Sequence, residues 1–196
     1  MTDEGDAREG PAAAVRLPGH HHPGPPSKLA RNLVIGALIA LVVGANVANA
    51  LLPVLVEEHP LWFIALNPSN RNLALASGEL SAWSFYLVGF LRLLLPDPLF
   101  FLLGRWYGDA AIRWMERKAP VYGELLRQLE QWFDRAKVPI VAVAPNNPVC
   151  LFAGAAGMSV AVFAAANVVG TAARLVLIRL FSEAFEGPLG SLKSFI

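Results

Sequence analysis

Two long stretches without any ionisable side chain constrain this chain more than any other feature. They run from Asn32 to Val56 and from Val138 to Ala173, 25 and 36 residues respectively. A helix that crosses a bilayer needs about 20 mostly apolar residues, and a soluble core of this size does not need such runs. Charged residues are only 16% of the 196-residue chain, against about 25% in ordinary soluble domains. The sequence therefore predicts an all-α integral membrane protein and disfavours a soluble enzyme or a DNA-binding domain.

The first uncharged stretch predicts a spanning helix from Asn32 to about Leu55. Two basic residues precede it and two glutamates follow it. Because basic residues favour the cytoplasmic side, we expect the N-terminus to lie inside the cell. Residues 1–28 are rich in proline and glycine and lack helical periodicity, which predicts a disordered cytoplasmic tail. We expect residues 187–196 to form a short C-terminal tail.

Two apolar segments are interrupted by turns that contain proline and asparagine. The turn around Pro68 has short apolar arms, and this pattern fits a surface loop and a re-entrant hairpin equally well. The turn around Pro145 lies between Val138–Ala144 and Val149–Ala153, inside a run too long for one span and too short for two. That pattern predicts a re-entrant hairpin. Non-helical backbone at membrane depth is tolerated only where protein covers it or it faces water.

An apolar segment over residues 80–104 contains Arg92 and Asp97, the latter between two prolines. An ionisable residue inside a span costs at least about 2.5 kcal/mol on insertion scales, so its presence indicates function. Two alternatives stay open: Asp97 pairs with Arg92, or it lies near the interface because the prolines break the helix. A last helix is expected from Met158 to about Leu180, where Arg174 and Arg179 either extend to the interface or pair with an acid in the interior.

Residues 105–137 differ from their neighbours, because basic and aromatic side chains alternate there with apolar ones at helical spacing. This pattern predicts an amphipathic helical segment at the membrane interface. Since it lies between spans, nucleic acid is disfavoured as a partner. The complete expectation is about three spanning helices, two opposed re-entrant hairpins and this interfacial segment. Two broken segments that each precede a long helix are typical of inverted-repeat transporters.

Two motifs resemble the DedA family, whose shared core is also called the SNARE-associated or VTT domain. The first is Asp97-x-x-x-Phe101-x-x-Gly104-Arg105-x-x-Gly108, and the second is Gly154-x-x-x-Met158-x-x-x-x-Phe163-x-x-x-Asn167-x-x-Gly170. The resemblance implies a DedA/VTT-like membrane domain over residues 29–186, with two re-entrant hairpins. It also implies a multi-pass cell-membrane flippase or scramblase for a phosphate-bearing lipid, such as a polyprenyl phosphate or a phospholipid, with a role in envelope homeostasis.

The chain departs from the functional residues that the resemblance implies. Family members carry three kinds of functional residue. One is an acid in the first hairpin, another is the aspartate that Asp97 matches, and the third is a pair of arginines around the proline of the second hairpin. Here residues 67–70 contain no carboxylate, and the arginine positions fall on Ala142 and Pro148. Asparagine amides donate weaker, uncharged hydrogen bonds than arginine. A degenerate scaffold without transport activity is therefore the alternative function.

The expected substrate-binding residues share a polar side chain in or beside the apolar segments: Asp97, Arg92, Arg105, Asn146, Asn147 and Asn70. Asp97 would act as the ionisable switch. We expect membrane lipids as partners and no catalytic residues, metal or cofactor, because no nucleophile–base pair lies at membrane depth. The single cysteine, Cys150, is interpreted as a buried packing residue. Proton or sodium coupling and homo-oligomerisation remain open.

Overall fold

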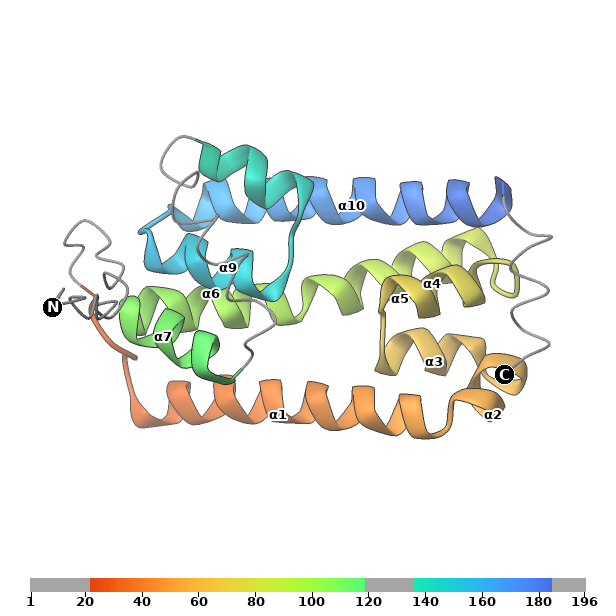
Figure 1. Cartoon of the computed structure of the whole chain (residues 1–196), viewed down its shortest axis with the longest axis horizontal. Coiled ribbons are helices and arrows are strands. Elements are labelled where there is room, and N and C mark those ends of the chain that lie inside the picture. Colours follow the sequence, from red (N-terminus) through yellow and green to blue (C-terminus); the bar gives the residue numbers. More distant parts are fainter. Residues whose placement is uncertain (1–21, 119–135, 185–196) are drawn as a thin grey trace, which may run out of the picture.

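Three long helices organise the computed structural model, which describes residues 22–118 and 136–184 and is all-helical there (Figure 1). They are α1 (Lys28–Ala50), the consecutive helices α5 (Ala82–Leu94) and α6 (Pro96–Tyr107), and α10 (Val160–Ala184). Each of these three spans is long and apolar enough to cross a membrane. In Figure 1, α1 and α10 run in one direction and α5–α6 returns between them. The predicted all-α membrane protein with three candidate spans is thus confirmed.

The first broken segment is a helical hairpin. Its arms are α3 (Pro60–Leu66) and α4 (Asn70–Ser77), joined by residues 67–69. The Ser69 hydroxyl accepts a 3.3 Å hydrogen bond from the Asn72 amide and so caps α4. A short helix, α2 (Leu52–Glu58), connects α1 to this hairpin. The first span was predicted to continue to about Leu55; it ends at Ala50 because a proline opens α2.

The second broken segment is also a helical hairpin. Residues 136–143 form its first arm and α9 (Asn147–Ala155) its second. The Asn146 side chain accepts a 3.1 Å hydrogen bond from the Val149 amide and caps α9. Figure 1 shows that both hairpins turn near the middle of the long helices and approach it from opposite ends. Both segments are thus helical hairpins, and their entry into a membrane from opposite sides stays a prediction.

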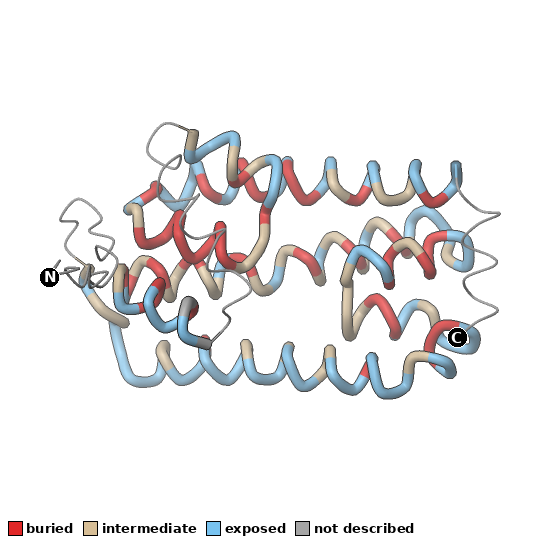
Figure 2. The backbone as a smooth tube through the Cα atoms, viewed as in Figure 1, coloured by how far each residue is buried: buried red, intermediate tan, exposed pale blue. Residues whose placement is uncertain are grey.

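Each hairpin packs against a span from the other half of the chain. Helix α4 contacts α10, and α9 contacts α6 along its length. Glycines allow the second contact: a Cβ on Gly104 would collide with the Leu151 carbonyl, and a Cβ on Gly154 with the Phe101 carbonyl. Figure 2 shows α9 as the most deeply buried helix, whereas α1 is exposed along most of its length. The core therefore lies between the hairpins and the two later spans.

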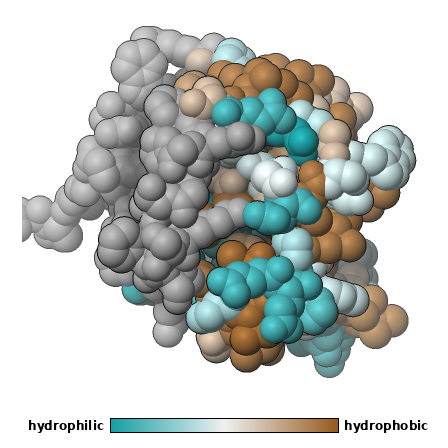
Figure 3. Space-filling view, turned by 90° about the vertical axis from the view of Figure 1, so that its right-hand side faces the viewer, coloured by the Kyte–Doolittle hydropathy of each residue, from teal (hydrophilic) through white to brown (hydrophobic). Residues whose placement is uncertain are grey.

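Charged side chains gather at the two ends of this helical bundle. The end that contains the start of α1 and α7 (Asp109–Lys118) carries mostly basic residues, namely Lys28, Arg31, Arg113, Arg117 and Lys137. The opposite end carries acids: Glu57, Glu58, Glu79 and Glu183. Figure 3 views that second end and shows hydrophilic side chains among apolar ones. The apolar length between two polar ends fits a membrane-spanning bundle.

The structure describes only part of the predicted interfacial segment and tails. In α7, Ile112 and Met115 are buried while Arg113 and Trp114 are exposed, so this helix is amphipathic. Its place at a membrane interface stays a prediction. Residues 119–135 of the same segment lie outside the described residues, as do most of the predicted N-terminal tail and all of the C-terminal one.

Candidate functional site

A cavity of about 1160 Å³ lies between α1 and the turns of both hairpins. One wall is an apolar stripe of α1 that includes Ile35, Leu38, Ile39 and Val42. The rest of the lining includes polar groups from five elements: Asn67 and Ser69 in the first turn, Asn146 and Asn147 at the second, Arg92 on α5, Asp97 on α6, and Arg174 on α10. The cavity therefore has a mostly apolar lining, into which both hairpin turns and three helices bring polar groups.

Asp97 is buried beside this cavity, with 3% of its surface exposed. Its carboxyl is hydrogen-bonded by the Asn167 and Cys150 side chains. The first alternative for Asp97, pairing with Arg92, is wrong. Among the described residues it makes no ion pair with Arg92, and it lies well inside the Ala82–Tyr107 span rather than at an end. The helix does break beside the prolines, at Leu95 between α5 and α6, as the second alternative expected, and the depth of Asp97 in a membrane stays a prediction.

Arg92 lines the cavity and also holds the first hairpin. Its Nε donates to the Ala65 carbonyl at 2.7 Å and its Nη2 to the Leu66 carbonyl at 2.9 Å. These carbonyls end α3, where helix geometry leaves acceptors unpaired and a cation is favoured. Two of its donors are thus used to fix the arm that leads into the first turn.

The structure does not bring Arg105 to the cavity. Its Nη1 donates to the Met158 carbonyl at 3.4 Å, in the connection between α9 and α10. This contact lies near the end of α6 rather than at the hairpin turns. Of the six predicted site residues, Asp97, Arg92, Asn146 and Asn147 line this one cavity.

Asn70, the sixth predicted residue, lies at the start of α4 and binds Arg174. Its Oδ1 accepts from Arg174 Nη2 at 2.6 Å and from Nε at 3.0 Å, while Nη1 approaches the Pro145 carbonyl at 3.4 Å. Arg174 therefore bridges the two hairpin turns. Both side chains line a second cavity of about 660 Å³ between α4, residues 142–143 and α10. Arg174 is the one residue shared by the two cavities.

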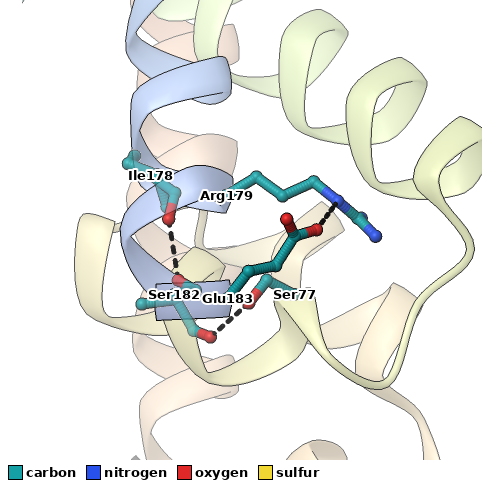
Figure 4. A network of polar contacts seen from close by, with 6 residues as sticks. Ser77, Ile178, Arg179, Ser182 and Glu183 are labelled. Carbon is teal, nitrogen blue, oxygen red and sulfur yellow. Dashed lines mark hydrogen bonds and ion pairs between the residues drawn. The ribbon is translucent and has the colours of Figure 1, made fainter. Parts of the chain in front are cut away.

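The sequence did not mark Arg174 as a site residue because the last helix was expected to end near Leu180. The helix extends from Val160 to Ala184, so Arg174 lies near its middle rather than at its outer end. A charge in the middle of an apolar helix was the signal that could have identified it. Arg179, nearer the end, pairs with an exposed acid one turn later rather than with an acid in the interior: its Nε lies 2.9 Å from Glu183 Oε1 (Figure 4).

The residues of the two sequence motifs meet each other in pairs. The Phe101 and Phe163 rings stack with centroids 4.2 Å apart. The other pairs are Asp97 with Asn167, Gly104 with the helix of Gly154, and Arg105 with Met158. Gly108, the last residue of the first motif, has a φ of 51° and ends α6. Residues far apart in sequence thus build one α6–α9–α10 contact that holds Asp97 in place.

Cys150 is buried, as predicted, and within the described ranges no cluster of three or more His, Cys, Asp or Glu residues could hold a metal ion. No protein-family model, curated protein or solved structure matches the chain. The resemblance to the DedA family therefore rests on the two motifs alone.

Proposed function

We propose that this chain is a multi-pass cell-membrane protein of the DedA type that moves a phosphate-bearing lipid between the leaflets of the bilayer. The observation that carries the proposal is the cavity of about 1160 Å³ with an apolar wall on α1 and polar groups from both hairpin turns. A lipid has the same two parts. Its headgroup would occupy the polar side while its tails follow α1.

The hairpin turns have the properties expected of backbone that re-enters a membrane. Exposed amide groups are not tolerated in lipid, and here the turns supply their own partners. Asn67 offers its carbonyl to the Asn72 side chain at 2.9 Å, and Ser69 and Asn146 cap the helices that follow. The basic end of the bundle would face the cytoplasm and the acidic end the outside.

Asp97 would be the ionisable switch of the transport cycle. It is the buried carboxyl at the cavity, and its partners Asn167 and Cys150 are uncharged. Because no full positive charge pairs with it directly among the described residues, its charge state can respond to what enters the cavity. Asn146 and Asn147 would supply neutral hydrogen bonds to the same headgroup.

Liposome reconstitution tests the proposal. Full-length protein is inserted into liposomes with a trace of fluorescent phosphatidylglycerol, and dithionite bleaches the label in the outer leaflet. We expect bleaching well beyond half of the label with wild-type protein. Asp97→Asn should lower translocation toward the protein-free rate, whereas Glu57→Gln, an equal charge change on an exposed helix end, should not. Equal rates for Asp97→Asn and wild type would show that the carboxylate has no such role.

A scaffold without transport activity is the second candidate. It is favoured by the neutral residues Ala142 and Pro148 in the second hairpin and by the engagement of Arg92 and Arg105 with backbone carbonyls. In the same liposomes, a scaffold would translocate no lipid at all. Purification from native membranes under mild detergent would then yield a stable protein partner in fixed ratio.

A further inference from the structure

Arg174 carries a positive charge into the middle of the bundle and has only neutral partners. Within the part of the chain that the structure describes, its guanidinium is bound by the Asn70 amide oxygen and the Pro145 carbonyl, and it makes no ion pair. These hydrogen-bond acceptors are neutral, and the acid that acts on the charge is Asp97, which lines the larger cavity with Arg174 but forms no ion pair with it among the described residues. A buried or half-buried charge of this kind favours an anion that can bring a full negative charge.

Two helix N-termini add to the positive potential at this point. The second arms of both hairpins begin at or near the groups that Arg174 binds. Helix α4 starts at Asn70 itself, and α9 starts at Asn147, two residues after Pro145. The N-terminal end of a helix carries a partial positive charge and favours anions. One guanidinium and two helix ends therefore act on the same small region, and Ser69 and Asn146 satisfy only some of the free amides.

The position of Arg174 between the two cavities gives this charge access to both. The larger cavity reaches Arg174 from the side of α1, and the smaller one reaches it from between α4 and the 142–143 arm. Gly170, one turn earlier on α10, allows the Ala142 backbone to approach and so helps to shape the smaller cavity. A ligand group bound at Arg174 could thus be received from one cavity and released to the other.

We propose that Arg174 is the headgroup-binding cation of this protein, and that a lipid phosphate binds it by displacing Asn70. The inference rests on the proposed function. Arginine binds phosphate with two parallel charge-assisted hydrogen bonds. Its Nε and Nη2, the pair suited to that geometry, are the atoms now held by the single Asn70 oxygen. Since Asn70 belongs to the first hairpin, phosphate binding removes the hydrogen bonds between that hairpin and Arg174, while α4 still packs against α10.

This exchange reverses the role that the sequence predicts for Asn70. As a direct substrate contact, Asn70 would strengthen binding, and its removal would weaken it. As a competitor for the Arg174 guanidinium, it weakens binding, and its removal strengthens it. The sign of one substitution therefore separates the two roles.

Titration calorimetry on full-length protein in detergent provides the test. The ligands are dihexanoyl phosphatidic acid, inorganic phosphate and dihexanoylglycerol, which lacks the phosphate. The variants are Arg174→Gln, Arg174→Lys, which keeps the charge without the planar fork, and Asn70→Ala. The matched control is Arg179→Gln, one and a half turns along the same helix and paired with Glu183 (Figure 4). Arg179 lines neither cavity.

We expect wild type to bind dihexanoyl phosphatidic acid more tightly than inorganic phosphate. Arg174→Gln should weaken that binding by about tenfold or more, since a charge-assisted pair of hydrogen bonds is lost. The affinity of Arg174→Lys for this lipid should fall between those of wild type and Arg174→Gln. Arg179→Gln should have the wild-type affinity, and Asn70→Ala should bind the lipid more tightly than wild type. Dihexanoylglycerol should not distinguish the variants.

Several results would overturn the inference. One is wild-type affinity for dihexanoyl phosphatidic acid in both Arg174 variants, and another is weakened binding of that lipid in Asn70→Ala. A third is inorganic phosphate that binds as tightly as the lipid, which would make this a site for the free ion. Failure of the proposed function looks different. If the binding pattern holds and liposomes show no translocation, the site stands and transport is wrong. If translocation holds and Arg174→Gln binds normally, transport stands and this site is wrong.

Discussion

Replacing Gly104 by alanine tests whether the α6–α9 contact holds the core together. A Cβ at this position would lie 2.8 Å from the Leu151 carbonyl carbon and 2.9 Å from the Ala155 nitrogen, with the Leu151 oxygen closer still. Carbon atoms in contact lie about 3.5–4.0 Å apart, so the helices must separate by roughly 1 Å. The colliding atoms are backbone, so no side-chain rotation can relieve the overlap.

The expected loss follows from two opposing contributions. Overpacking of a core costs about 1–3 kcal/mol, and a backbone collision belongs at the upper end. Alanine in place of glycine within a helix stabilises the folded state by about 1 kcal/mol, because alanine has the higher helix propensity. The net loss of about 2 kcal/mol corresponds to a fall in Tm of about 4–8 °C for a chain of this size.

Gly36→Ala is the matched control, because a Cβ on Gly36 in α1 meets nothing within 4 Å. It receives the same helix-propensity gain without a collision, so its Tm should rise by about 2–4 °C. Thermal unfolding of both variants in detergent, followed by tryptophan fluorescence, measures the two shifts. The reasoning is refuted if Gly104→Ala is as stable as Gly36→Ala.

Two further predictions concern the buried carboxyl and the topology. Asn167→Leu removes a hydrogen bond to Asp97, so we expect a stability loss of about 1–3 kcal/mol, with the exposed Asn46→Leu as control; equal Tm values for the two would contradict this. In a cysteine-free background, a cysteine at residue 58 should react with an impermeant thiol reagent from outside intact cells and one at residue 124 only after permeabilisation. Labelling of residue 124 from outside alone would reverse the arrangement.

The positions of the two turns could be predicted from the sequence because these turns carry local signals. Pro68 and Pro145 cannot donate amides, and the serine and asparagine that follow them are N-cap residues. The uncharged runs likewise predicted the spans. Both kinds of signal act within a few residues of the chain, so neither requires knowledge of the tertiary structure.

The site could be predicted only in part because it depends on contacts between distant residues. The prolines at residues 96 and 98 suggested a break, and the helix is divided there into α5 and α6, but only the structure shows that the two parts together form one candidate span. Arg105 is polar and near a motif, but its partner is a carbonyl 53 residues later. Arg174 binds Asn70 across 104 residues. No local pattern in the sequence reports which of these cations faces a cavity.

Each hairpin packs against a helix from the other half of the chain, and this arrangement affects how the protein is assembled during synthesis. The first hairpin packs through α4 on α10, and the second packs through α9 on α6. In the proposed topology, the first hairpin enters the membrane long before α10 is synthesised, and the Asn70 side chain then still lacks its hydrogen bonds to the Arg174 guanidinium. A nascent chain that stops before α10 should be held by insertion factors or degraded, because its polar turn faces lipid. We expect the last helix to complete both hairpins in a single late step of assembly.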